Sequence, residues 1–304
     1  MTVHLSDIES AADQIAGVVL RTPLIEAPEL SALSGATVFL KLENLQRAGS
    51  FKTRGALVKL LSLSPDQRRV GVVAMSAGNH AQGVAYHARR LGLPATIVMP
   101  RFTPFTKVER TRAMNAQVVL EGETLADAQA HAEQLADRKH LTFVHPYDDP
   151  LVIAGQGTVA LEMLAERPDL DALVVPVGGG GLIAGMAVAA KAIRPPIEVF
   201  GVQAEQYPSM LQALRGQPPR VSGSTLAEGI AVKIPGRLTL PLIRDHVADI
   251  LLVGESALEK SVQLLLEIQK VIAEGAGAAA LAALLGHRPV SYTHLRAHET
   301  RMVI

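Results

Sequence analysis

A regular alternation of short apolar segments with longer helix-forming segments constrains the fold of this chain more than any other feature. Strands are predicted at 37–42, 70–75, 95–99, 117–120, 141–144, 173–177, 198–202 and 250–253. Helices are predicted at 6–18, 81–91, 106–115, 124–139, 157–165, from 182 onward, at 256–272 and at 276–285, the first with a capping box at Ser6 and Glu9. Strands that alternate with helices of this length favour parallel sheets covered by helices. The sequence therefore predicts an α/β protein.

Length and composition narrow the class of protein. The chain has 304 residues, 48% of them hydrophobic, which is enough for one large domain or two of ordinary size. It carries 29 basic and 29 acidic residues, a net charge of zero that argues against a nucleic-acid partner. It has no cysteine, which excludes disulfides and thiolate chemistry. The first residues lack the pattern of a signal peptide and no apolar segment reaches membrane length, so we expect a cytoplasmic protein without a membrane partner.

The segment Ser50–Ala56 contains the first candidate catalytic residue, Lys52. Phe51 precedes the lysine, and the apolar segment Gly55–Val58 predicts a helix that begins beside it. At a helix N-terminus, the helix dipole and partial burial would lower the pKa of the amine and favour its neutral form. Considered alone, a solvated surface lysine remains the simpler alternative.

Two glycine-containing loops follow predicted strands, at the position where open α/β sheets bind ligands. Ser76–His80 offers N–H groups and polar side chains that suit a carboxylate, although Ser76 and Asn79 are also good helix caps. Gly178–Gly181 lies between a strand and a helix and predicts an anion site of bare N–H groups. A dinucleotide-binding loop is the rival interpretation, but the next strand ends at Gln203 without the acidic residue that such a loop requires.

A lysine, an asparagine loop and a glycine-rich anion site are the parts that a pyridoxal phosphate (PLP) enzyme needs. The amine links covalently to the cofactor, the amide provides a partner for the ring, and the glycine loop holds the phosphate. PLP is therefore the predicted cofactor.

Six ordered segments resemble the threonine/serine dehydratases, which belong to the tryptophan-synthase-β-like, fold-type-II PLP enzymes. They are Ser50–Ala56, Ser76–Gly83, His145–Thr158, Pro176–Gly181, Glu228–Val232 and Glu274–Ala278, within a resemblance that runs from about Leu5 to Val290. The resemblance implies two three-layer α/β domains with mostly parallel sheets. Residues 1–42 and 151–290 would form the large domain and residues 43–150 the small one, with the site in the cleft between them.

The resemblance also implies the role of each site residue. Lys52 would hold PLP and act as the base at the substrate Cα, and Asn79 would donate a hydrogen bond to the oxygen on the cofactor ring. The remaining predicted contacts are Gly178, Gly179, Gly180, Gly181 and Leu182 for the phosphate, Phe51 and Glu228 beside the cofactor, Tyr147 as a lining residue, and Ser76, Gly78 and His80 for the substrate carboxylate. The implied activity is the dehydration and deamination of L-threonine or L-serine, in isoleucine biosynthesis or threonine catabolism. A homo-oligomer, dimer or tetramer, is expected.

Two departures bear on the alternatives of a serine racemase or a threo-3-hydroxyaspartate ammonia-lyase. Ala77 stands where serine racemase carries the serine that protonates the opposite face of Cα, and a methyl group cannot move a proton. Gln203 stands where metal-activated racemases have a carboxylate, which hard cations prefer, so no metal is expected.

The last stretch departs from the family more strongly. After Val290 the family continues with an apolar strand and a turn whose Ser or Cys meets the cofactor's ring nitrogen, whereas Ser291–Arg301 is polar. A metal pair of His294 and His298 is a minor alternative. We expect residues 291–304 to be an artefactual, non-family tail that does not complete the domain and leaves a sheet edge uncovered. A PLP-binding but catalytically inert protein is therefore the alternative of another class.

Overall fold

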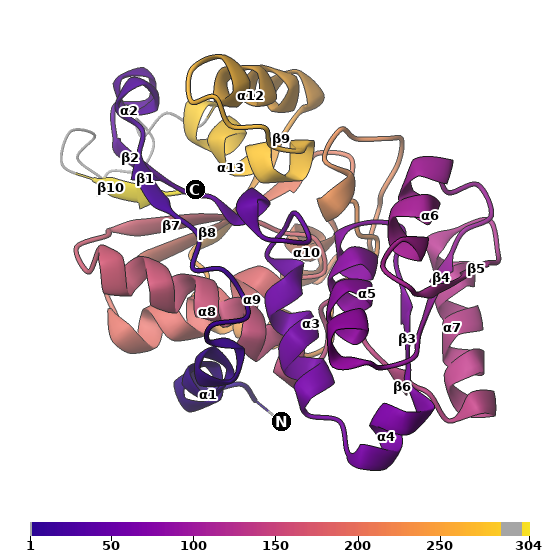
Figure 1. The fold of residues 1–304 in the computed structure, drawn as a ribbon. Helices are drawn as coiled ribbons and strands as arrows, with labels where there is room; N and C mark the ends of the chain where they lie inside the picture. Colours follow the sequence, from indigo (N-terminus) through magenta and orange to yellow (C-terminus); the bar gives the residue numbers. More distant parts are fainter. Residues whose placement is uncertain (1, 287–299) are drawn as a thin grey trace.

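Two sheets, each covered by helices on both faces, lie side by side in the computed structural model, which describes residues 2–286 and 300–304 (Figure 1). The first sheet has the order β1 (Leu24–Glu26), β2 (Thr37–Lys41), β10 (Arg301–Val303), β7 (Ala172–Pro176), β8 (Glu198–Ala204) and β9 (Asp249–Val253). The second has the order β5 (Gln117–Leu120), β4 (Ala95–Met99), β3 (Val72–Met75) and β6 (Thr142–Phe143). Among these strands only the β1–β2 pair is antiparallel. The predicted α/β class with mostly parallel sheets is confirmed.

Both faces of the six-stranded sheet are buried, and we call this sheet with its helices the large lobe. Leu173 and Val175 of β7 pack toward α1 (Leu5–Ile15), α8 (Pro150–Glu166) and α9 (Gly181–Ile193). Ala172 and Val174 point to the opposite face, against α12 (Glu255–Glu267) and α13 (Gly275–Gly286). The shorter helices of this lobe are α2 (Pro28–Ser34), η1 (Glu43–Leu45), α10 (Ser209–Leu214), η2 (Glu228–Ile230) and α11 (Thr239–His246). Burial on both faces explains why β7 is a continuous apolar segment.

The four-stranded sheet with its helices forms the small lobe. Val72 and Ala74 of β3 face α5 (Asn79–Leu91) and α6 (Phe105–Arg112), whereas Val73 and Met75 face α7 (Leu125–Lys139). The short α4 (Pro65–Val70) precedes β3. The domain boundaries expected at residues 43 and 150 stay predictions, but all four strands of this sheet lie between them.

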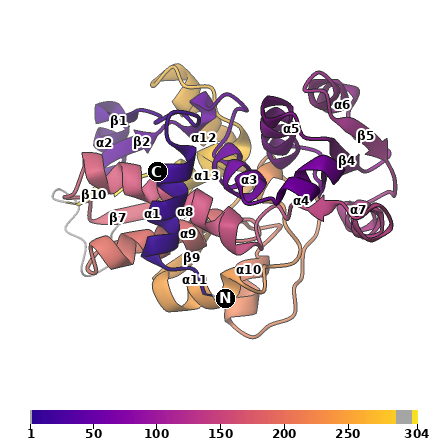
Figure 2. The same ribbon diagram turned by 60° about the horizontal axis from the view of Figure 1, so that its bottom comes forward.

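Helix α3 (Lys52–Leu61) lies between the two lobes, packed against α8 on one side and α5 on the other (Figure 2). A Cβ added to Gly55 would lie 2.6 Å from the Val152 carbonyl oxygen of α8. One added to Gly83 of α5 would lie 3.3 Å from the carbonyl carbon of Lys52. Side chains at these glycines would push the helices apart, so the glycines set the position of the helix that begins with Lys52.

A buried ionic cluster fixes the same helix to the large lobe. Arg54 is fully buried, and its guanidinium lies 2.7 Å from a Glu43 oxygen and 2.6 Å from a Glu162 oxygen. Lys41 completes the cluster with an ion pair of 2.6 Å to Glu162. Burial lowers the pKa of Arg54, but hydrogen bonds and charge from Glu43 and Glu162 raise it above its usual value. Removing one member would leave a buried charge without its partner, which is strongly destabilising.

The last described residues correct the expectation that the chain leaves its sheet incomplete. Arg301–Val303 form β10, which pairs in parallel with β2 on one side and β7 on the other. The buried side chains of Met302 and Val303 supply the apolar strand that the polar segment before them lacks. The strand is central, so its loss would split the sheet and not merely expose an edge. His294 and His298 lie outside the described residues.

Several helix boundaries differ from the predicted ones because capping groups decide them. Helix α1 begins at Leu5, since the N–H of His4 donates to the Asp7 carboxylate, and not at the expected capping box two residues later. Helix α8 begins at Pro150 and not near Gly157, because the Asp149 carboxylate accepts hydrogen bonds from the first-turn N–H groups. Side-chain caps of this kind stop or start a helix independently of its apolar pattern.

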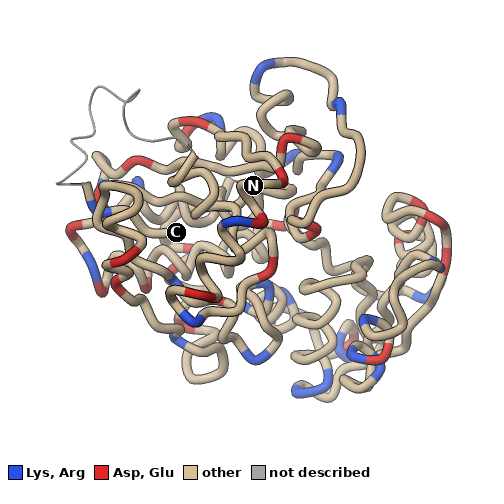
Figure 3. The backbone as a smooth tube through the Cα atoms, turned by 90° about the horizontal axis from the view of Figure 1, so that it is seen from above, with Lys and Arg blue, Asp and Glu red and all other residues tan. Residues whose placement is uncertain are grey.

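Charge is distributed over the whole molecule. Figure 3 shows basic and acidic residues interspersed along both lobes, in agreement with the balanced composition. Across residues 2–286 and 300–304, none of the helices has the length and apolarity needed to cross a membrane.

Candidate active site

Lys52 lies at the first position of α3 and points toward the end of the small sheet. Its Nζ donates a hydrogen bond of 2.6 Å to the Pro146 carbonyl oxygen and lies 5.4 Å from the centre of the Phe51 ring. Burial lowers the pKa of Lys52 to about 8, against a smaller opposing effect from the negative charge of Glu274. A substantial fraction of the amine is therefore neutral near physiological pH, as a nucleophile or base requires.

The glycine loop between β7 and α9 is shaped by close contact with Tyr147. A Cβ added to Gly179 would overlap the Tyr147 ring, and one added to Gly181 would lie 2.9 Å from the Tyr147 carbonyl oxygen. Gly180 has a φ of 98°, a left-handed conformation that glycine adopts without strain. The loop therefore accepts only glycine at these positions, and its N–H groups at the start of α9 remain available to an anion.

Hydrogen bonds from the segment after residue 233 hold the same loop in place. The Thr239 hydroxyl donates to the Gly179 carbonyl over 2.7 Å, and the Gly236 N–H donates to it over 3.1 Å. The Asp148 carboxylate accepts from the N–H groups of Arg237 and Leu238 at 2.9 and 2.8 Å. This segment therefore packs as one unit with the glycine loop.

One dipeptide connects the lysine with the glycine loop. The carbonyl of Pro146 accepts the Lys52 hydrogen bond, and the next residue, Tyr147, covers Gly179 and Gly181. The Tyr147 hydroxyl donates to the Ile234 carbonyl over 2.9 Å, and burial raises its pKa to about 12. The structure thus brings together the predicted amine and the predicted phosphate site, which are far apart in the sequence.

The Ser76–His80 loop follows β3 and leads into α5, as expected. The Ser76 hydroxyl accepts from the Gly78 N–H over 3.1 Å, and a Cβ added to Gly78 would meet no atom within 4 Å. The Ser76–His80 loop therefore leaves open space at Gly78, whereas the glycine loop is closely packed. The first N–H groups of α5 have no acceptor in a preceding turn, which suits a carboxylate ligand.

The imidazole of His80 lies inside the small lobe, so the predicted contact of His80 with the substrate carboxylate, which stays a prediction, would use its backbone. The residue is only 3% exposed, and its Nε2 lies 2.9 Å from the Val144 carbonyl oxygen inside the small lobe. Burial and, to a smaller extent, the charge of Lys52 lower its pKa to about 3. The ring is therefore a neutral core group, and only the backbone of His80 faces the loop.

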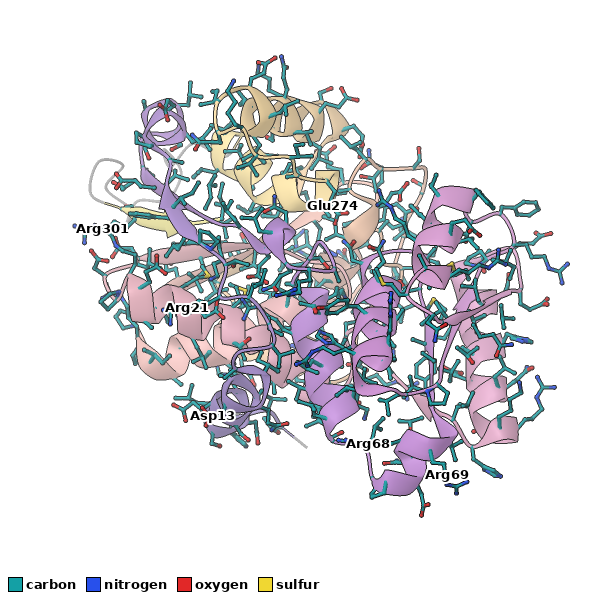
Figure 4. All side chains as sticks on the ribbon, viewed as in Figure 1. Asp13, Arg21, Arg68, Arg69, Glu274 and Arg301 are labelled. Carbon is teal, nitrogen blue, oxygen red and sulfur yellow. The ribbon has the colours of Figure 1, made fainter. Side chains whose placement is uncertain are left out.

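Side-chain contacts join the two lobes across the predicted cleft. The Asn79 amide donates to Glu274 Oε1 over 2.8 Å, and the Lys107 ammonium pairs with Glu228 Oε2 at 2.5 Å. Figure 4 labels Glu274, which lies between α13 and the small lobe. Glu228, predicted beside the cofactor, is thus tied to α6 at the exposed rim of the cleft.

A family description of pyridoxal-phosphate-dependent enzymes matches residues 15–295. The chain belongs to this family. An L-threonine ammonia-lyase from Thermotoga maritima is 50% identical over 93% of this chain and 71% of its own. A catabolic L-threonine dehydratase from Staphylococcus aureus is 44% identical over 93% of this chain and 83% of its own.

Solved structures of PLP-dependent enzymes show the same fold. Maize serine racemase superposes with a TM-score of 0.94 at 34% identity, covering 100% of this chain and 92% of its own. The processed form of threonine deaminase isoform 2 from Solanum lycopersicum superposes with a TM-score of 0.90 at 35% identity, covering 98% of this chain and 87% of its own. Both the predicted fold type and the predicted family are confirmed.

The residues present fit PLP. The crowded glycine loop presents backbone N–H groups at a helix start, which suits the phosphate, and Lys52 supplies an amine with a lowered pKa on the other side of Tyr147. Gln203 has a structural role: its amide donates to the Val177 carbonyl and accepts from the Leu211 N–H at 3.3 and 3.0 Å. In the part of the chain that the structure describes, no cluster of three or more His, Asp or Glu residues is arranged to hold a metal.

Sequence reasoning missed the residues that support the site from a distance. Glu274, Lys107 and Thr239 each contact a predicted site residue, and Asp148 binds the segment that holds the glycine loop, yet none of the four was singled out. Glu274 opens one of the six segments that carry the family resemblance, so a signal for this residue was present. Asp148 lies within another of these segments, His145–Thr158, whereas nothing comparable marks Lys107 and Thr239.

Proposed function

We propose that this enzyme is an ammonia-lyase that dehydrates and deaminates L-threonine and L-serine. The observation that carries the proposal is the lysine with a lowered pKa, held by the Pro146 carbonyl beside a glycine loop that only glycine can form. The names of the relatives from Thermotoga maritima and Staphylococcus aureus support threonine as a substrate. The products would be 2-oxobutanoate from threonine and pyruvate from serine, each with ammonia.

Each residue has a defined task in this proposal. When bound, PLP supplies an electron sink that makes the Cα proton of an amino acid acidic. The N–H groups of Gly178–Gly181 and Leu182 would hold its phosphate, and Asn79 would donate a hydrogen bond to its ring oxygen. The Ser76–His80 backbone binds the substrate carboxylate, and Phe51 and Glu228 lie at the sides of the cofactor.

Lys52 carries the proton transfer. Its neutral amine takes the proton from Cα, because a base with a pKa of about 8 combines a populated neutral form with sufficient basicity. The β-hydroxyl then leaves with a proton as water. Hydrolysis of the resulting enamine replaces its C–N bond with a carbonyl and releases ammonia. The balance requires no oxidant or reductant.

Serine racemisation is the second candidate, favoured by the close superposition on maize serine racemase. A racemase needs a second acid–base group on the opposite face of Cα, and Ala77 cannot supply one. A threo-3-hydroxyaspartate ammonia-lyase would use the same residues on a more acidic substrate. We rank both below the threonine/serine lyase. The homo-oligomeric state, the cytoplasmic location and the division into two domains stay predictions.

The test is the purified, PLP-loaded enzyme incubated with L-threonine, L-serine, threo-3-hydroxyaspartate and D-serine in separate reactions. We expect stoichiometric ammonia and 2-oxo acid from L-threonine and L-serine, with L-threonine at least as good a substrate. Release of ammonia from hydroxyaspartate alone would overturn the substrate assignment. Spectroscopic binding of PLP without ammonia from any substrate would identify an inert PLP-binding protein instead.

A further inference from the structure

Glu274 is a carboxylate at the cleft wall to which no task has been given so far. It immediately precedes α13 on the large lobe, and its backbone carbonyl accepts the first hydrogen bond of that helix from the Ala278 N–H. Its side chain points away from the helix, across the cleft, to the first residue of α5. The 2.8 Å contact with Asn79 Nδ2 therefore joins the large lobe to the predicted cofactor-binding residue of the small lobe.

The chemistry of the two groups makes this contact directional. An amide has two N–H donors on one side and a carbonyl acceptor on the other, whereas an ionised carboxylate only accepts. Glu274 therefore selects the nitrogen side of the Asn79 amide and excludes the flipped arrangement, which would place two acceptors in contact. One N–H bonds Glu274, and the second remains available to an acceptor in the cleft.

The surroundings hold the carboxylate in position. A Cβ added to Gly229 of η2 would lie 3.1 Å from Glu274 Oε1, so η2 approaches closely only because this residue is glycine. Partial burial raises the pKa of Glu274, and the charge of Glu228 raises it further. The Asn79 hydrogen bond and the positive charges of Lys107 and Lys52 oppose these effects.

We propose that Glu274 is a positioning residue that orients the Asn79 amide for donation to the ring oxygen of PLP. The inference rests on the proposed function, because it takes the role of Asn79 from there. Without Glu274, the amide is free to flip and to present its carbonyl to an electron-rich oxygen. In the intact protein, Asn79 and Glu274 therefore act as one unit in cofactor binding.

The chain offers a matched control for this unit. Lys107 and Glu228 form another contact between the lobes, so Lys107→Gln removes a link between them but leaves the Asn79–Glu274 hydrogen bond in place. A loss that comes from loosening the two lobes should appear in both variants. A loss that comes from amide orientation should appear in Glu274→Gln alone.

The test is a double-mutant cycle on PLP affinity. PLP is removed from the holoenzyme of wild type, N79A, E274Q, N79A/E274Q and K107Q, and is then titrated back while its absorbance is followed. We expect N79A and E274Q each to weaken binding on the order of tenfold, and the double variant to lose no more than the more affected single variant. K107Q, which keeps the Asn79–Glu274 hydrogen bond, should weaken binding clearly less than E274Q does. Wild-type affinity in E274Q, or fully additive losses in the double variant, would overturn the proposal.

A second measurement needs no variant at Glu274 and guards against misfolding. The side-chain amide resonances of Asn79 in the cofactor-free protein, assigned by their absence from N79A, are followed as the pH is lowered from neutral to about 4. Protonation of Glu274 should move them, and constant resonances would contradict the orientation. The wild-type ammonia assay separates the two claims: ammonia release with an unaffected E274Q refutes only the positioning role, and failure of wild type to release ammonia refutes only the proposed function.

Discussion

The two walls of the cleft are built in opposite ways. On the large lobe, the glycine loop is enclosed by Tyr147, and Thr239 and Gly236 hydrogen-bond to it, so no side chain larger than hydrogen fits. On the small lobe, Ser76–His80 is open, and a Cβ at Gly78 would meet nothing. The comparison teaches that the proposed phosphate-binding loop is closely packed before any ligand binds, whereas the proposed substrate-binding loop leaves open space at Gly78.

Lys52 begins helix α3, which lies between the two lobes, so its removal should have the largest effect on activity. We expect Lys52→Ala to lower turnover by about a thousandfold or more, because general base catalysis contributes on that order and the covalent attachment is lost as well. Some non-covalent PLP binding should remain, since the glycine loop is intact. Ammonia release and PLP retention after gel filtration measure the two effects. Lys260→Ala, at an exposed lysine of α12, is the control, and multiple turnovers at the wild-type rate in Lys52→Ala would refute its role as base.

Two alanine substitutions, one in each loop, test the difference in packing between the two walls. Gly179→Ala should lower the free energy of unfolding by about 1–3 kcal/mol and weaken PLP binding, because its methyl group would overlap the Tyr147 ring. Gly78→Ala should leave the free energy of unfolding within about 0.5 kcal/mol of wild type but raise the KM for threonine, because its methyl group enters only the ligand's space. Denaturant unfolding and steady-state kinetics distinguish the outcomes. Equal stability losses at both positions would remove the distinction between the walls.

The stability of the small lobe should also depend on pH, because the His80 ring is buried in its core. Its pKa is about 3 in the folded protein and about 6.5 when unfolded, so the unfolded state binds more protons between these values. This contribution to stability is complete above pH 6.5 and is lost as the pH falls, by about 1 kcal/mol per pH unit. His80→Gln should reduce the slope, although His87, with a pKa of about 4 for the same reason of burial, retains part of it.

The measurement is denaturant unfolding of the cofactor-free protein at several pH values between about 7.5 and 5. Gln134→Ala, at an exposed residue of α7 that does not ionise, is the control and should leave the slope as in wild type. An unchanged slope in His80→Gln would mean that the ring is not the neutral core group described above.

The smallest expected effect is a gain of racemase activity on substitution of Ala77. Ala77→Ser places a hydroxyl on the open wall, where an acid for the opposite face of Cα would be needed, and should add slow serine racemisation to an otherwise unchanged lyase. Chiral analysis of the serine remaining after incubation detects it. Background levels of D-serine in a folded, ammonia-releasing variant would show that a hydroxyl at this position is insufficient.

Much of the fold was predictable because local patterns determine it. The strand Ala95–Met99 was predicted with its observed bounds, and the glycine loop was correctly placed between β7 and α9. β1 and α2 were missed, because three- and seven-residue elements carry too little periodicity to distinguish them from loops. β10 was missed because Met302 and Val303 follow a polar segment, and only pairing with two distant strands makes them a strand.

The same distinction between local pattern and long-range contact applies to the residues of the site. The helix start at Lys52 was predictable from its neighbours, and its pKa is lowered by burial as expected, whereas its catalytic role stays a prediction. The burial of the His80 ring was not predictable, since the same residue type at a loop–helix junction serves equally in a core or toward a ligand. The partnership of Asn79 with Glu274 depends on how two lobes meet, which no local pattern encodes.

The central place of β10 has a consequence for how this polypeptide is made. All strands of the small sheet lie between Val72 and Phe143, so that sheet can assemble while the chain is still being synthesised. The large sheet forms later, because the two neighbours of β10, β2 and β7, are joined only after Val303 has left the ribosome. Until then the apolar faces of β2 and β7 are exposed in the nascent chain. Aggregation is therefore most favoured, and chaperone binding most useful, during this interval.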